Sequence, residues 1–193
     1  MQPSFTYALP KSCYRWFASN KLERVTGLEN LNTSQVTNMS SMLEGCQATE
    51  LAIQTFDTYN VTDMSAMFKD CSLLTTLDIS HLNTGLVTTM KEMFSGCKSL
   101  QTLDVGPFKT FSVENMQSMF FDCAKLEEID LNNFNTDKLQ NIAVMFGRCG
   151  RLHTIWCDNS WSEIEHYANM FTGCESLKGA VPYKESMTTL DGR

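Results

Sequence analysis

The sequence predicts an α/β repeat protein, in which units of one strand and one short helix stack into a solenoid. The first observation is a row of cysteines that returns at nearly constant intervals: Cys46, Cys71, Cys97, Cys123, Cys149 and Cys174. The second is that apolar residues return at fixed distances from each cysteine, so that VTTMKEMFSGCKSLQTL at 87–103 is followed by VENMQSMFFDCAKLEEI at 113–129. Self-similarity at a period of about 20 to 50 residues is typical of stacked repeats.

The residues that follow each cysteine of the row predict a short strand. Leu103, Asp104 and Val105 have the period-two alternation of a strand with one buried face. Equivalent triplets occur at 77–79 and 129–131. Because equivalent segments stack next to each other, we expect one parallel sheet along one side of the molecule, with the central residue of each triplet pointing outward.

The second half of each unit predicts a short helix. Val113, Met116, Met119, Phe120 and Cys123 are three or four residues apart, which places them on one helical stripe. We expect this stripe of Met and Phe side chains to be core rather than a binding groove. Glycines precede several cysteines of the row, at the point where a helix can end in a left-handed residue; they are Gly45, Gly96 and Gly173.

A strand, a turn and a short helix in one unit fit a leucine-rich repeat, whose period is about 20 to 29 residues. The sequence therefore predicts a leucine-rich-repeat right-handed solenoid of about seven coils, with the parallel sheet on one face and the helices on the other. We expect a single solenoid domain at 13–177, with degenerate caps at 13–35 and 157–177. Residues 1–12 are predicted to be an N-terminal lead-in, and residues 178–193 a polar C-terminal tail without the period.

The regular spacing of the cysteines argues against disulfides. Equivalent side chains in stacked coils point the same way at about 4.8 Å, whereas a disulfide needs Cβ atoms about 3.5 to 4.5 Å apart and aimed at each other. We therefore expect a ladder of buried thiols. The sequence does not decide whether Cys13 and Cys157, outside this row, are exposed. It contains no CxxC pair, and its three histidines fall at different points of the repeat, so we expect no metal centre and no cofactor.

The composition excludes several classes of function. The net charge is −7 and the 15 Lys and Arg residues are scattered, so we expect no nucleic-acid binding. No apolar run approaches the roughly 18 residues of a membrane-spanning helix. The start, MQPSFTYALPK, lacks the pattern of a signal peptide, which leaves open a cytoplasmic protein or one from which the signal was removed. No Ser, His and Asp arrangement and no phosphate-binding loop is recognisable, so an enzyme is not expected.

The repeat resembles that of the BspA-like leucine-rich-repeat surface proteins of bacteria. The segments that carry the resemblance are LNTSQVTNMSSMLEGC at 31–46 and LNTGLVTTMKEMFSGCKSLQTLDV at 82–105. The unit of these proteins is approximately SLxxLDLSxFNTSxVTNMSxMFxGC, and the resemblance covers about residues 13–177. It implies a cell-surface or secreted protein that adheres to host or matrix proteins and has no catalytic motif.

The outward face of the predicted sheet is the candidate binding surface. Its Asp series, Asp78, Asp104 and Asp130, stacks like charges, which repel and are not expected to stabilise the fold. A solvated polar face, a surface for a cationic partner and a weakly held Ca²⁺ all remain possible for this series. Trp156 lies at the same outward position, either as an exposed anchor for a partner or buried under the C-terminal tail. The complete candidate face is Thr76, Asp78, Thr102, Asp104, Glu128, Asp130, Asn132, Thr154, Trp156 and Asp158.

These observations favour a non-catalytic module that binds a protein on a host surface or in the extracellular matrix. Two alternatives remain. One is a structural spacer that displays another domain and has no ligand of its own. The other is a cytoplasmic interaction scaffold.

Overall fold

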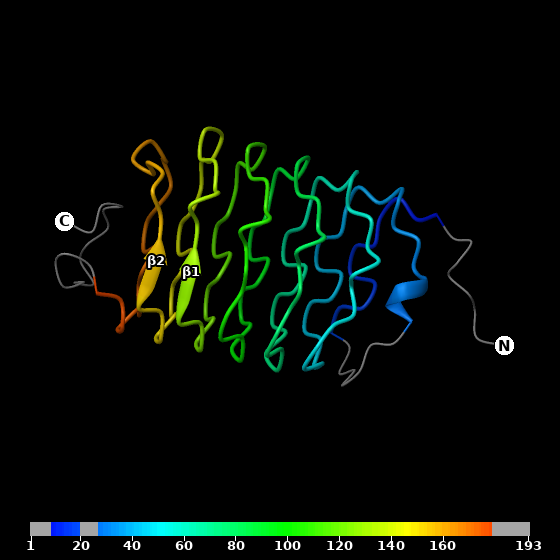
Figure 1. The fold of residues 1–193 in the computed structure, drawn as a ribbon, viewed down its shortest axis with the longest axis horizontal. Coiled ribbons are helices and arrows are strands. Elements are labelled where there is room, and N and C mark those ends of the chain that lie inside the picture. The colour runs from blue at the N-terminus through cyan, green and yellow to red at the C-terminus, as the bar shows by residue number, and fades with distance from the viewer. Residues whose placement is uncertain (1–8, 20–26, 179–193) are drawn as a thin grey trace.

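The chain is arranged as a row of narrow coils, each formed by one repeat of the sequence. The computed structural model describes residues 9–19 and 27–178, and Figure 1 shows these coils side by side in sequence order. Within these residues, six parallel bridges join each coil to the next along one edge. They run Ser12↔Asn38, Asn38↔Asp63, Asp63↔Thr89, Thr89↔Asn115, Asn115↔Asn141 and Asn141↔His166. The stacking of consecutive repeats therefore agrees with the period of the sequence, while the handedness and the number of coils stay predictions.

The core runs along the inside of the whole row. The predicted Met and Phe stripe is fully buried in it, as Met90, Met93 and Phe94 show in one coil. The phenylalanines of successive coils stack with their rings within 8° of parallel and their centroids 5.3 to 5.9 Å apart. These rings are Phe68, Phe94, Phe120, Phe146 and Phe171.

The predicted helices are not formed. Each stripe is a series of tight turns instead, in which Met93 N–H donates to the carbonyl of Met90 and Cys97 N–H to that of Phe94. The backbone N–H groups of alternate residues bond to the neighbouring coil instead: those of Met90 and Phe94 donate to carbonyls of the next coil at 2.9 Å. Linked turns and a helix both bring residues three and four apart to one side, so the burial pattern alone could not separate them. The only helix among the described residues is the 3-10 helix η2 (Leu28–Asn30).

The linked turns require left-handed residues at two places in each coil. Directly before the cysteines, Gly96 has φ 76° and Gly45 and Gly173 have similar angles, as expected for these glycines. Asp70, Asp122 and Arg148 are left-handed at the same place of the other coils. The other place, five residues before each cysteine, is left-handed without glycine, as in Glu92 with φ 58°. A non-glycine residue with positive φ is uncommon in proteins, so its return in successive coils marks it as part of the repeat.

The predicted parallel sheet is present in only one pair of the described coils. Strand β1 (Glu128–Asp130) pairs in parallel with β2 (Thr154–Trp156), and Figure 1 shows them in neighbouring coils. Among the described residues, no backbone hydrogen bond joins the triplets 77–79 and 103–105. Pairing these triplets would place Asp78 directly beside Asp104, and like charges at opposed positions destabilise a ladder. The pair that does form places Asp130 opposite the uncharged Trp156.

The cysteine row forms the predicted ladder of buried thiols. All eight cysteines of the chain are free. From Cys71 onward, the Sγ of each cysteine of the row donates to a carbonyl of the preceding coil, as Cys97 does to Phe68 at 3.2 Å. Burial raises the pKa of the Cys97 thiol to about 12, because the interior disfavours the thiolate. Of the two cysteines outside the row, Cys13 is buried and Cys157 is exposed.

A second ladder, which the sequence analysis did not predict, follows the turn after each strand position. The hydroxyl of each threonine donates to a carbonyl in the next coil at 2.9 to 3.1 Å. The threonines return with the period of the cysteine row: Thr33, Thr58, Thr84, Thr110 and Thr136. Their regular return in the sequence was the available signal for the ladder.

The predicted ends of the domain lie partly outside the described residues. The described part of the chain does not include residues 1–8 of the lead-in, 20–26 of the N-terminal cap or 179–193 of the tail. Within the described part of the chain, no helix has the length and apolar character needed to cross a membrane.

Candidate protein-binding face

The structure places the predicted binding residues on the outside of the coils. Nine of the ten are exposed and Thr154 is partly buried. Between them, residues such as Ile129 in β1 and Leu131 point into the core. This alternation is the period-two pattern that predicted the face. The nine exposed residues are Thr76, Asp78, Thr102, Asp104, Glu128, Asp130, Asn132, Trp156 and Asp158.

The Asp series has a structural role that the sequence analysis did not expect. The carboxylates of Asp104 and Asp130 each accept a hydrogen bond at 2.9 Å from the backbone N–H two residues later. Asp78 does the same with Ser80 and also accepts from its hydroxyl at 2.7 Å. Such bonds fix the turn after the strand position. The expectation that these residues do not stabilise the fold is therefore wrong, because each holds a local turn.

The hydrogen bonds from Ser80 also affect the acidity of Asp78. The Ser80 hydroxyl and N–H lower the pKa of Asp78, because they favour the ionised carboxylate. Asp78 therefore keeps its negative charge at neutral pH. In the described ranges, no three or more His, Cys, Asp or Glu side chains form a group that could hold a metal ion.

Trp156 is the one aromatic side chain among the ten residues of this face. It is 51% exposed, at the end of β2 and opposite Asp130 in the strand register. The N–H of Leu131 donates to the Trp156 carbonyl at 2.8 Å, which fixes the backbone beneath the indole. Beside it, the Asn132 side chain accepts from the N–H of Asp158 at 2.9 Å. The indole thus lies exposed on a rigid support of two hydrogen-bonded coils.

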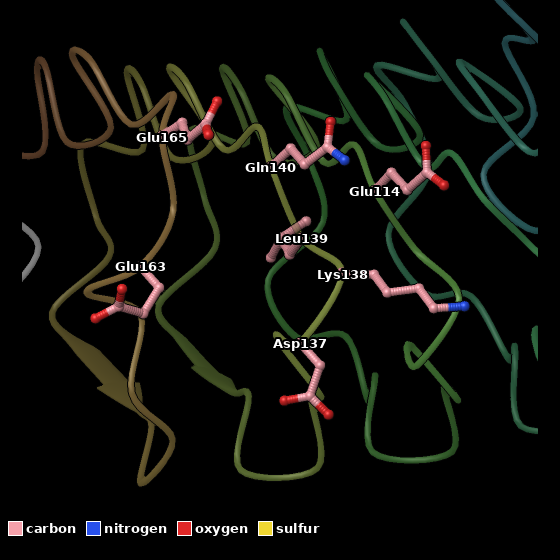
Figure 2. Close-up of a pocket in the computed structure, with 7 residues that line it drawn as sticks. All are labelled: Glu114, Asp137, Lys138, Leu139, Gln140, Glu163 and Glu165. Atoms are coloured by element: carbon pink, nitrogen blue, oxygen red, sulfur yellow. The ribbon is translucent and has the colours of Figure 1, made fainter.

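A second surface feature lies outside the predicted face. An open hollow of about 390 Å³ is lined by side chains from three successive coils, none of which is among the ten predicted residues. Figure 2 shows Glu114, Gln140 and Glu165 in a row across it. The other lining residues are Asp137, Lys138, Leu139 and Glu163. With four carboxylates and one ammonium, the lining carries a charge of −3.

An exposed apolar row, also missed from the sequence, leads toward this hollow. Tyr59, Leu86 and Phe111 are 70%, 53% and 51% exposed, and lie on the same turn of three successive coils. The available signal was positional. These apolar residues stand one or two positions after a threonine of the ladder, where other repeats carry polar residues such as Ser34 and Lys138.

Comparison with known protein families assigns the chain to one of them. Residues 11–104 and 75–183 each match one family model, described as Mycoplasma protein of unknown function, DUF285. The chain belongs to this family. The finer assignment to the BspA-like repeat motif remains a resemblance, and the DUF285 description gives no activity.

Further comparisons add little to the DUF285 assignment. Among curated proteins, none matches the sequence. The leucine-rich-repeat protein of T. pallidum, TpLRR, is 17% identical over 77% of both chains, with a TM-score of 0.36. A leucine-rich-repeat protein from Bacteroides ovatus ATCC 8483 is 17% identical over 79% of this chain and 55% of its own, with a TM-score of 0.24. Similarities of this size carry no argument about the fold, which rests on the hydrogen bonds of the coils themselves.

Proposed function

We propose that this DUF285 chain is a non-catalytic protein-binding module of a cell-surface or secreted protein, built as a leucine-rich-repeat solenoid. The face that carries the Asp series and Trp156 is its binding surface. The observation that carries the proposal is Trp156, an indole half exposed among polar side chains on a hydrogen-bonded pair of coils. Exposed aromatic residues on rigid supports are frequent anchors of protein interfaces.

The rigid coils support this proposal energetically. Binding costs free energy whenever loops or side chains must be ordered, and a surface that is already ordered avoids part of this cost. On the proposed face, Asp104 and Asp130 are fixed by turn hydrogen bonds and Asn132 by Asp158. Many small polar contacts can then add to the burial of the Trp156 indole.

The buried thiols are compatible with a location outside the cell. Free cysteines are uncommon in oxidising compartments because exposed thiolates react. In this chain the thiols of the row are buried, and burial raises the pKa of Cys97 and Cys174. They therefore need no reducing environment to stay intact. The resemblance to the BspA-like surface proteins favours the same location.

The test is binding of the purified chain to a panel of extracellular-matrix and host-surface proteins. We expect saturable binding to at least one member, and a loss of about tenfold or more in affinity in Trp156→Ala. Asp104→Asn removes the charge but keeps a side-chain oxygen for the turn, so it separates binding from folding. Leu73→Ala is a matched control, because Leu73 is 46% exposed and lies outside the proposed face.

Two results would contradict the proposal. Equal binding by wild type and by the Trp156→Ala and Asp104→Asn variants would place the binding surface elsewhere. Absence of binding to every member of the panel would favour a structural spacer that displays another domain, or an interaction scaffold inside the cell.

A further inference from the structure

Tyr59, Leu86 and Phe111, here called the apolar row, lie on the surface of three successive coils. Each side chain is more than half exposed. Their positions lie on the turn held by the threonine ladder, where Thr58 and Thr84 bond to the next coil. Large exposed apolar side chains gathered on one surface mark interaction sites more often than single ones do.

Phe111 connects the surfaces of two neighbouring coils in the apolar row. Its Cζ lies 3.4 Å from the place that a Cβ on Gly85 would occupy, so the ring covers the glycine of the preceding coil, next to Leu86. Ser112 supports this arrangement by donating to the Gly85 carbonyl at 3.0 Å. Phe111 thus covers Gly85, which holds the position equivalent to its own, and Tyr59 carries an aromatic ring at that position one coil earlier.

The apolar row is followed by the acidic hollow. Asp137 directly follows Thr136 of the ladder, as Phe111 follows Thr110, so it holds the equivalent position of the next coil and there lines the hollow. Among the described residues, none of the three ion pairs of the chain involves a residue of the hollow. Figure 2 shows Lys138 extending away from Glu163. Asp137 accepts a hydrogen bond from the Asn135 side chain and Glu163 one from Ser162. None of the four carboxylates is neutralised by an ion pair with a described residue, so the hollow keeps its charge for a cationic partner.

We propose that the apolar row and the acidic hollow together bind an extended segment of a partner protein. The segment carries large apolar side chains for the row, next to a cluster of Lys or Arg for the hollow. Three stacked coils place the ends of the row about 10 Å apart, a distance covered by about three extended residues. Opposite charges then fix which part of the segment faces the hollow.

The charge of the chain argues against a second copy as the occupant. The net charge of −7 makes two copies repel each other. The 15 Lys and Arg residues are scattered along the sequence, with no basic run to match the hollow. This surface is also separate from the proposed Trp156 face, so either can fail without the other.

The experiment is selection of random phage-displayed peptides on the immobilised full chain, followed by affinity measurements on synthetic copies of the enriched peptides. We expect these peptides to combine aromatic or aliphatic residues with adjacent Lys or Arg. Their affinity is expected to fall about tenfold in Phe111→Ser. It should also fall in Glu114→Gln/Glu165→Gln and weaken with added salt, because the basic end is held by charge.

Matched controls use residues elsewhere on the surface. Leu73→Ser replaces an apolar side chain that is 46% exposed, and Glu50→Gln removes an exposed carboxylate, both outside the apolar row and the hollow. Neither is expected to change the affinity for the selected peptides. Circular dichroism on all variants checks that the coils are retained.

Three outcomes would overturn the proposal. The first is that no peptide is enriched, or that the enriched peptides lack basic residues. The second is unchanged affinity in Phe111→Ser and in the double Glu variant. The third is a dimer, seen by sedimentation velocity and lost in Phe111→Ser, which would make a second copy the occupant.

Discussion

The hydroxyl of Thr84 makes two hydrogen bonds to the backbone of Lys109 in the next coil. It accepts from the Lys109 N–H at 2.7 Å and donates to the Lys109 carbonyl at 3.1 Å. Thr84 is fully buried. One side chain thus bonds both the N–H and the carbonyl of Lys109, a residue that is not in a strand. The same reciprocal pairs are Thr33 with Asp57, Thr58 with Asn83, and Thr110 with Asn135.

This relationship predicts the effect of removing the hydroxyl. Thr84→Val keeps the shape but leaves the Lys109 N–H and carbonyl unbonded, so we expect a loss of about 2 kcal/mol in the free energy of unfolding. Urea unfolding measures it. Thr88→Val is the control, because the Thr88 hydroxyl is exposed and makes one bond of 3.2 Å, to the Thr62 carbonyl. Its expected loss is about 0.5 kcal/mol or less, and equal losses in the two variants would refute a special role for the ladder.

The cysteines are predicted to differ sharply in reactivity. Cys157 is exposed, and the other seven thiols are buried in the core. A thiol reagent such as dithionitrobenzoate should therefore modify one cysteine per chain in the native protein and all eight after denaturation. Slow modification is expected even at Cys157, since neighbouring atoms keep part of the water away from its thiol, which raises its pKa and lowers its thiolate content at neutral pH. Rapid reaction of two or more native thiols would contradict the buried ladder.

The thiol ladder also predicts a loss of stability at high pH. Burial raises the pKa of Cys97 from 9.0 to about 12, so between these values the unfolded chain loses a proton that the folded chain keeps. The stabilisation is complete below pH 9 and falls as pH rises, by about 1.4 kcal/mol per pH unit for each such thiol.

Unfolding titrations of wild type and Cys97→Ala between pH 9 and pH 12 test this directly. All other titrating groups are shared, so we expect the variant to lose stability less steeply, by the contribution of one thiol. Parallel curves would show that Cys97 ionises equally in the folded and unfolded chains.

Two glycines should respond in opposite ways to alanine. At Gly96 the backbone is left-handed, and an added Cβ would overlap the Asp70 carboxylate and come within 3.2 Å of the Asp70 Cα. We expect Gly96→Ala to cost about 1 to 3 kcal/mol. Around Gly150 no atom lies within 4 Å of an added Cβ, so Gly150→Ala should change stability little. Thermal unfolding of both variants gives the comparison, and a Gly96→Ala variant as stable as wild type would exclude strain at this turn.

The sequence predicted which residues are buried better than it predicted the backbone that buries them. Met93 and Phe94 were placed in the core because of their spacing, and both are fully buried. The same spacing suggested a helix, but an isolated helix would bond within its own coil, whereas Phe94 N–H reaches the Met119 carbonyl of the next coil. Hydrogen bonds between repeats cannot be recognised from the periodicity of a single repeat.

On the strand face, too, the exposure of a residue was predicted but its hydrogen bond was not. The outward position of Asp104 followed from the alternation around it, and it is confirmed by its exposure. Its bond to the Gly106 N–H was not anticipated, because an acidic residue on a predicted strand suggests a solvated side chain. The apolar row was not predicted for another reason: Tyr59, Leu86 and Phe111 come onto the same turn of successive coils, and Phe111 covers Gly85, only when the coils are stacked.

Insertions and deletions of residues are restricted to certain places in a repeat. The restriction comes from the bonds of the cysteine row, the left-handed turns and the threonine ladder. Each ladder needs its residue at a fixed place in the coil, so an insertion or deletion inside the linked turns would break several bonds at once. The repeat from Cys46 to Cys71 is one residue shorter than the next, and Ile53 stands one position closer to its cysteine than Ile79 does. The missing residue therefore lies between the cysteine row and the threonine ladder. Whole repeats can be added or lost without disturbing the rest, and single residues can be lost only in such intervals.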